Sequence, residues 1–310
     1  MENCDKLLVI ADVNRNEQLA FARAAEMVIR SKTTSSVTFF LCVYDFSYEM
    51  LSILSRDEHE KIRRQIIHQR EKWMHKTAKP YFNENFKLNI KVVWHNKPHE
   101  AILREVFLGS HSIVIKSTQK HETLQSIIFT PTDHALLLGC PAPLLFVKSR
   151  DWPQNASILG SINPETNADI NFYHYTMEQL HNFTKQFNLT PYIINFYSVS
   201  DSNSNTRLSK LNPKAYSNFS CKFHFISIET TRKKRNDSVK QRIIEEGLPE
   251  IVIPTAAKKL NAAMLIIGMN QTTSYSTNFG ENNIENIIKK TDCDILILKS
   301  ERYTALNENN

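Results

Sequence analysis

The stretch Ala142–Lys148, APLLFVK, returns 151 residues later as Cys293–Lys299, CDILILK. Each copy is a run of large apolar residues that ends in lysine, a pattern typical of a buried strand in a parallel sheet. A strand of this kind needs a strand beside it and helices above and below it. Each copy therefore predicts a complete α/β unit around itself, and the spacing of the copies sets the size of that unit.

Two further pairs of segments support this repeat. Residues 7–12 form an apolar run that ends in Asp12, and residues 157–163 form a similar run that ends in Asn163, again 151 positions later. In each half a helix opened by proline also leads into an apolar strand, at 97–116 and at 248–268. We therefore predict two tandem domains, residues 1–150 and residues 151–310, joined near Arg150–Pro153.

Strands and helices alternate through the first copy, which predicts a parallel sheet covered on both faces. A capping box at Ser55 and Glu58 opens the longest helix, and Pro80 ends it. In folds of this class, ligands bind at the carboxyl ends of the strands, where the strand order reverses. The predicted strands are 6–11, 37–43, 88–93, 112–116 and 144–147, and the predicted helices are 16–30, 55–79, 98–108 and 132–138.

The composition is that of a globular protein, with 41% hydrophobic and 23% charged residues among 310. The 38 Lys and Arg residues exceed the 32 Asp and Glu residues by only six. This excess is mild, and without a concentrated basic stripe we expect no direct contact with nucleic acid. No leader pattern and no apolar segment of membrane-spanning length is present, so we expect a cytoplasmic protein without a membrane span.

The sequence contains no recognisable catalytic or metal-binding pattern. The five cysteines lie far apart and lack zinc-type spacing, which favours buried, reduced thiols. His68 and His75, like His95 and His99, have no acids or thiols at metal-ligand spacing, so solvated or core histidines are expected. No G-x-S-x-G elbow or Ser-His-Asp order occurs. We therefore predict no catalytic residues and no metal ligands, and we lean towards a protein that is not an enzyme.

Several motifs give the chain a family resemblance. They are VYDFSYEM (43–50), KVVWHN (91–96), IFTPTD (128–133), CPAPLLFVK (140–148) and, in the second copy, GLPEIVIP (247–254). With these motifs the sequence resembles the universal stress protein family, in its tandem-domain E type. The resemblance implies two Rossmann-like domains of the adenine nucleotide alpha hydrolase-like kind, each with a five-stranded parallel sheet. They would pack as an intramolecular pseudo-dimer, with strands 144–147 and 295–298 side by side.

The resemblance also implies a cytoplasmic stress-response protein, linked in this type to resistance to DNA-damaging agents. Some family members bind ATP and others do not. In the members that do, the loop after the fourth strand carries three glycines and then Ser or Thr. Glycines let backbone N–H groups approach the phosphates closely, and the helix that follows adds its dipole.

In the first copy this loop has lost all its glycines. The motif positions fall on Lys116, Gln119, Phe129 and Thr130, so that only the hydroxyl remains. Phe129 is expected to put an aromatic ring where a phosphate would lie, although Lys116 could supply charge in place of backbone donors. Asp12 and Val43 match the family's adenosine-side positions. Thr130 and Pro131 also have a simpler interpretation, as the N-cap and first-turn proline of a helix.

The second copy keeps more of the motif. Gly268 and Gly280 are retained, whereas the middle glycine is replaced and the spacing is one residue short. Glu281, an acid, stands where a hydroxyl residue is expected and would repel phosphate. Asn163 replaces the acid that follows the first strand. ATP is therefore a possible cofactor, and the second copy is the better candidate for binding it.

The aromatic stretch YDFSYEML, residues 44–51, follows the second predicted strand and has three interpretations. It could cap the core, form an apolar wall for a hydrophobic or amphiphilic ligand, or contact another domain or protein. Together these features predict a non-catalytic regulator or ligand-binding module, with a partly apolar pocket between the halves at the strand ends. Weak ATP hydrolysis through the second copy, and a scaffold that recruits other universal stress proteins, are the alternatives.

Overall fold

The structure is a computed structural model, which describes residues 6–31, 36–51, 53–82, 88–120, 127–148, 151–153, 155–161, 170–197, 224–229, 244–246, 249–269 and 281–299. The chain divides into two compact units, one of residues 1–121 and 128–147 and one of residues 122–127 and 148–310. The domain limits predicted at residues 150 and 151, and the predicted packing of strands 144–147 and 295–298, stay predictions.

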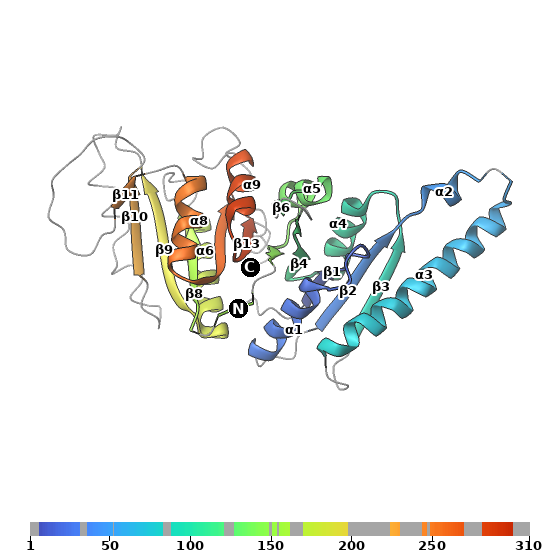
Figure 1. Ribbon diagram of the computed structural model, residues 1–310, viewed down its shortest axis with the longest axis horizontal. Helices are drawn as coiled ribbons and strands as arrows, with labels where there is room; N and C mark the ends of the chain where they lie inside the picture. The colour runs from blue at the N-terminus through green and yellow to red at the C-terminus, as the bar shows by residue number, and fades with distance from the viewer. Residues whose placement is uncertain are drawn as a thin grey trace. The chain divides into compact units, whose positions relative to one another are not determined.

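The first unit is a five-stranded parallel sheet with helices between its strands, as predicted (Figure 1). Its strand order is β7-β4-β1-β2-β3, so the order reverses between β1 and β4. Its elements are β1 (Lys6–Ile10), α1 (Leu19–Ser31), β2 (Ser36–Val43), α2 (Phe46–Glu49), α3 (Arg56–Ala78), the 3-10 helix η1 (Lys79–Tyr81), β3 (Leu88–Trp94), α4 (Pro98–Gly109), β4 (Ile113–Ser117), β5 (Gln119–Lys120), β6 (Ile127–Ile128), α5 (Pro131–Gly139) and β7 (Leu144–Val147).

Helices cover both faces of this sheet because its connections run in two directions. α1 and α3 carry the chain outward from β1 to β3, whereas α4 and α5 carry it back to β4 and on to β7. Crossovers between parallel strands are right-handed, so the two directions of travel place the two pairs of helices on opposite faces. The central strands are accordingly apolar, and Leu8, Val9 and Val114 are fully buried.

Helix α3 begins as predicted and is longer than the strand that it covers. Ser55 accepts a hydrogen bond from the Glu58 backbone, and the Glu58 carboxylate accepts one from the Ser55 backbone. At 1.5 Å per residue, its 23 residues span about 34 Å. The seven residues of β3 span only about 23 Å. The first turns of α3 therefore extend beyond the end of β3, with α2 beside them (Figure 1).

The second unit is also a parallel α/β sheet. Its described strands have the order β11-β10-β9-β8-β12-β13, one strand more than predicted because the three-residue β11 adds to the edge. α8 begins at Pro249 and leads into β12, as predicted. The described elements are β8 (Ser157–Ser161), α6 (Ile170–Phe187), β9 (Thr190–Tyr197), β10 (His224–Glu229), β11 (Ile244–Glu246), α8 (Pro249–Lys259), β12 (Ala262–Met269), α9 (Glu281–Lys290) and β13 (Asp294–Lys299).

A buried carboxylate at the start of β13 holds the segment that enters the second unit. Asp294 is 1% exposed. Its Oδ1 accepts a hydrogen bond from the Lys148 backbone N–H at 2.8 Å, and its Oδ2 accepts one from the Trp152 indole at 2.9 Å. The Lys148 ammonium donates to the carbonyl of Ile288 at 2.6 Å. Residues on both sides of position 150 are thus fixed to β13 through one acidic side chain.

Candidate functional site

A cavity of about 230 Å³ opens in the first unit at the carboxyl ends of β1, β2 and β4. The strand order reverses there, which is where open parallel sheets bind their ligands. Three of the predicted site residues, Asp12, Lys116 and Thr130, line this cavity together, whereas Val43 is not among the lining residues. The other lining residues are Ile10, Ala11, Val13, Asn14, Leu41, Cys42, Pro98, Ile102, Ser117, Gln119 and Thr132.

The loop after β1 folds around Asp12. The Asn14 backbone donates to Asp12 Oδ1 at 3.0 Å, and the Arg15 Nε lies 3.6 Å from Oδ2. Gln18 secures the same loop, since its Oε1 accepts from the Asp12 N–H at 3.0 Å and its Nε2 donates to the Asp12 carbonyl at 2.6 Å. Gln18 is not among the residues predicted from the sequence. Its only signal was a polar residue directly before a predicted apolar helix face, and this residue is 2% exposed.

The N-terminus of α5 is closed by a reciprocal capping box, which confirms Thr130 as the N-cap and Pro131 as a first-turn proline. The Asp133 N–H donates to Thr130 Oγ1 at 3.1 Å. Asp133 Oδ2 in turn accepts from the Thr130 N–H at 2.8 Å and from its hydroxyl at 2.7 Å. The Asp133 carboxylate is 1% exposed and therefore belongs to the interior of the unit.

The same carboxylate also holds Lys116. The Lys116 ammonium lies 2.7 Å from Asp133 Oδ1, as an ion pair outside ideal hydrogen-bond geometry, and its side chain is 12% exposed. A helix N-terminus with a nearby cation is a natural place for a phosphate. Here Asp133 pairs with the lysine that was expected to attract phosphate, although Asp133 itself is not among the residues that line the cavity. A phosphate group would have to compete with this buried carboxylate for Lys116.

Phe129, which was expected to put an aromatic ring where a phosphate would lie, faces the interior of the unit beside β7. Its ring packs against Phe146 of β7 at a centroid distance of 5.7 Å and against His134 at 6.5 Å. Phe129 is not among the residues that line the cavity. The residue in the first turn of α5 that contacts Lys116 is instead the small, charged Asp133.

The second strand presents Cys42, and not Val43, to the cavity. The Val43 carbonyl is occupied, because it accepts a hydrogen bond from the His95 N–H at 3.0 Å. The Cys42 thiol donates to the His95 carbonyl at 3.2 Å. Burial raises the pKa of the Cys42 thiol to about 11. This edge of the cavity is therefore lined by a neutral thiol.

We expect Cys42 to react slowly with iodoacetamide at pH 8. Since the pKa of this thiol is about 11, only about one molecule in a thousand carries the thiolate at that pH. The rate of alkylation should rise about tenfold per pH unit between pH 8 and pH 10. Mass spectrometry of the Cys42 peptide measures this rate, with free cysteine as the reference. Labelling of Cys42 at pH 8 as fast as that of free cysteine would contradict the prediction.

In the second unit, the structure describes one of the three predicted site residues. Gly280 and Asn163 lie outside the described residues. Gly268 is the second-last residue of β12, and it packs against α6. A β-carbon at this position would lie 3.1 Å from Phe172 Cε1 and 3.1 Å from Thr176 Oγ1. Close packing of a helix on a strand is therefore sufficient reason for this glycine, without a phosphate.

A buried hydroxyl marks the point at which strand order reverses in the second unit. Ser161 ends β8, lies in register with Ile267 of β12 and is 2% exposed. Within the described part of the chain its Oγ has no hydrogen-bond partner. Buried polar groups are normally satisfied. Ser161 is therefore a described polar group of this unit that a bound ligand could satisfy.

We expect Gly268→Val to lower the free energy of unfolding by about 1–3 kcal/mol, because the larger side chain overpacks the α6–β12 contact. Urea unfolding followed by circular dichroism measures the change. Gly139→Val is the matched control, since a β-carbon at that exposed position meets its nearest atom, on Leu103, at an ordinary 3.5 Å. Equal stability of the two variants would show that α6 does not need the glycine.

Comparison with known proteins identifies the family. The model of the universal stress protein family matches residues 3–148. Universal stress protein E of Escherichia coli (strain K12) is 34% identical over 303 residues, which cover 96% of this chain and 94% of that protein. This chain belongs to the universal stress protein family. It is also 34% identical to universal stress protein E of Photorhabdus laumondii subsp. laumondii, over 98% of this chain and 97% of that protein.

Solved structures show the same fold over both halves. A putative universal stress protein from Pseudomonas aeruginosa UCBPP-PA14 matches with a TM-score of 0.66 at 20% identity, over 99% of this chain and 97% of that chain. A universal stress protein from Archaeoglobus fulgidus DSM 4304 matches with a TM-score of 0.65 at 12% identity, over 96% and 98%. The Rossmann-like, tandem architecture of the family is thus shared by this chain.

Neither a metal-binding cluster nor a membrane-spanning helix occurs among the described residues of this universal stress protein. They contain no group of three or more His, Cys, Asp or Glu side chains able to hold a metal ion. None of the helices that these residues form combines the length and the apolar character needed to cross a bilayer.

The aromatic stretch 44–51 does not cap the core, so that interpretation is wrong. α2 has no buried residue, and Phe46 and Met50 are 64% and 65% exposed. The stretch contributes no residue to the cavity lining either. Its anchor is the acidic Glu49, whose carboxylate accepts two hydrogen bonds from Arg63, at 2.8 and 2.6 Å, and one from the Trp94 indole at 2.9 Å. The Arg63 hydrogen bonds, followed by the one from Trp94, lower the pKa of Glu49.

Proposed function

We propose that this universal stress protein acts in the stress response by binding and not by catalysis, and that its first unit binds a small uncharged ligand. The observation that supports this proposal is the Lys116–Asp133 pair, in which the lysine expected to attract phosphate already has a buried carboxylate partner within the protein. A cytoplasmic location and a contribution to resistance against DNA-damaging agents belong to the same proposal.

The cavity itself indicates the kind of ligand. Its volume of about 230 Å³ is below the range of about 300–1,000 Å³ that is usual for drug-sized ligands. Apolar walls come from Ile10, Leu41 and Ile102, and hydrogen-bonding groups come from Thr130 and Gln119. With Lys116 neutralised by Asp133, a small, partly apolar molecule with hydrogen-bonding groups suits this site better than a nucleoside triphosphate.

Native mass spectrometry of the protein as isolated, followed by calorimetry with ATP and Mg²⁺, tests the proposal. We expect a co-purifying small mass, and no saturable heat with ATP. Thr132→Trp, which fills the cavity from α5, should abolish the bound mass. Ile29→Trp on the exposed face of α1 is the matched control, because Ile29 is 73% exposed.

Two outcomes would contradict the proposal. A clean apo mass would argue against a ligand carrier. Saturable ATP binding that Thr132→Trp abolishes would show that the first unit takes a nucleotide after all. ATP binding that survives Thr132→Trp would support the alternative of a nucleotide site in the second unit, near Ser161.

A scaffold function is the second candidate, and the exposed apolar residues of the 44–51 stretch favour it. A soluble protein gains nothing from leaving Phe46 and Met50 in water unless a partner covers them. A pull-down that loses its partner in Phe46→Ser/Met50→Ser would support this function, and an unchanged set of partners would argue against it.

A further inference from the structure

One face of α3 has no cover among the described residues. The buried residues of this 23-residue helix are Met74 and Ala78, both in its last two turns. Its first turns extend past the end of β3 (Figure 1). On the outer side a shallow groove of about 470 Å³ runs along the helix, lined by Asp57, Glu60, Lys61, Arg64, Gln65 and His68. We call these six residues the α3 stripe.

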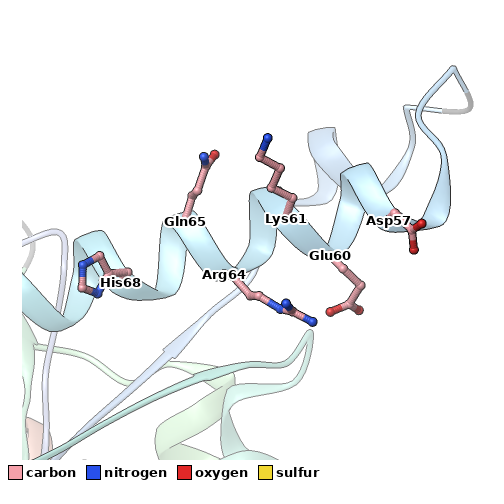
Figure 2. A pocket seen from close by; sticks show the side chains of 6 residues that line it. All are labelled: Asp57, Glu60, Lys61, Arg64, Gln65 and His68. Atoms are coloured by element: carbon pink, nitrogen blue, oxygen red, sulfur yellow. The ribbon is translucent and has the colours of Figure 1, made fainter.

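The α3 stripe consists of two parallel rows of side chains. Residues four apart lie on one face of a helix, so Asp57, Lys61 and Gln65 form one row. The second row is formed by Glu60, Arg64 and His68. Figure 2 shows Lys61 and Gln65 on one side of the helix, with Glu60 and Arg64 on the other side. In both rows the charges follow one order along the helix, with an acid, then a base, then an uncharged or weakly basic group.

Three of the four charged side chains of the stripe, Asp57, Lys61 and Arg64, form no ion pair among the described residues. Spacing by four would allow Asp57 to pair with Lys61 and Glu60 to pair with Arg64. Among the described residues neither ion pair forms; Glu60 is instead bonded at 2.9 Å by Arg63, which also holds Glu49. The helix dipole explains one acid in the first turn. It does not explain the same acid-then-base order in two rows.

We propose that a second copy of this chain docks on the α3 stripe, with the two α3 helices antiparallel about a two-fold axis between positions 60 and 61. In this arrangement Asp57 faces Arg64 of the second copy, and Glu60 faces Lys61 of the second copy. The axis repeats each contact, so the acids of each copy meet the bases of the other. Such self-complementarity is what an isologous interface requires. A parallel arrangement would put like charges against each other.

A second copy fits this face better than a partner of another kind. The stripe carries two acids and two bases, so a partner of a single charge sign would meet repulsion over half of it. Two exposed apolar residues precede the N-terminus of the same helix in the chain: Ile53 is 88% exposed and Met50 is 65% exposed. Antiparallel pairing brings this end of each copy alongside the α3 helix of the other. Exposed ion pairs contribute little by themselves, so the apolar residues would supply affinity and the charges would supply register.

Sedimentation velocity on the full chain tests this proposal with two charge-reversed variants. Asp57→Lys/Glu60→Lys makes the stripe wholly basic, and Lys61→Glu/Arg64→Glu makes it wholly acidic. We expect a dimer for the unmodified chain, and for each variant a dissociation constant raised by about 100-fold. Mixing the two variants should restore a dimer. This restoration also shows that both variants are folded.

The matched control is Lys76→Glu/Arg104→Glu, two exposed bases outside the stripe. It changes the net charge as much as the acidic variant does and should leave the dimer intact. A monomeric unmodified chain at its highest soluble concentration would overturn the proposal. Dimers that persist in both charge-reversed variants, or variants that stay monomeric when mixed, would overturn it as well.

Discussion

Asp133→Ala is expected to lower the free energy of unfolding by about 3–5 kcal/mol. Removing one member of a buried ion pair leaves the other charge uncompensated, and here that charge is Lys116 at 12% exposure. The substitution also removes the carboxylate that caps the Thr130 N–H and hydroxyl. Urea unfolding followed by circular dichroism, at constant ionic strength, measures the loss.

The same variant is expected to gain affinity for inorganic phosphate. With Asp133 removed, the α5 N-terminus and the Lys116 ammonium form an anion site of the usual kind. Phosphate at ten times its dissociation constant should then restore about 1.4 kcal/mol of stability. The unmodified protein should show no such effect, since its own carboxylate holds that position.

Two matched variants separate the charge of Asp133 from its capping role. Asp133→Asn keeps a side-chain oxygen for the cap but loses the charge, so most of the destabilisation should remain. Lys116→Ala/Asp133→Ala removes both charges and should respond to phosphate more weakly than Asp133→Ala. If Asp133→Asn were as stable as the unmodified protein, the ion pair would contribute nothing and the argument against a bound phosphate would fail.

Asp294→Ala is expected to lower the free energy of unfolding by a similar amount, about 3–5 kcal/mol. The carboxylate is 1% exposed and accepts from two buried donors, the Lys148 N–H and the Trp152 indole. Each buried donor left unsatisfied costs about 1–3 kcal/mol. Because both donors lie in the segment that enters the second unit, proteolysis near position 150 should also become faster.

Trp152→Phe provides the matched comparison for Asp294→Ala. It removes one donor and keeps most of the apolar contact with Phe187, whose ring centroid lies 5.2 Å away. A smaller loss, of about 1–2 kcal/mol, is expected. In the double variant the two losses should not add, because both changes break the same hydrogen bond. Additive losses would show that the indole and the carboxylate act independently.

Local signals in the sequence predicted the fold well. The capping box at Ser55, the N-cap at Thr130 and the repeated apolar strands depend on neighbouring residues, and the structure confirms them. What the sequence could not predict depends on tertiary contacts. Nothing in the pattern shows that Asp133 reaches back to Lys116, or that α6 packs on Gly268.

The aromatic stretch 44–51 is a second feature whose environment depends on tertiary contacts. Its composition favours burial, but a sequence pattern does not show whether other parts of the fold lie where they could cover it. In the structure Glu49, the polar member of the stretch, is held by Arg63 and Trp94, and this contact fixes α2 with its apolar side chains outward. One acidic side chain thus anchors α2, while Phe46 and Met50 beside it stay exposed.

The closed N-terminus of α5 has a consequence for how such a protein would respond to the metabolic state of a cell. Asp133 belongs to the chain, so its effective concentration at the helix start is fixed by the fold and does not change with supply. A free phosphate compound must compete with an anion that is always present and already hydrogen-bonded. If the first unit binds an uncharged ligand as proposed, occupancy of this position would be fixed by folding and would not follow swings in energy charge.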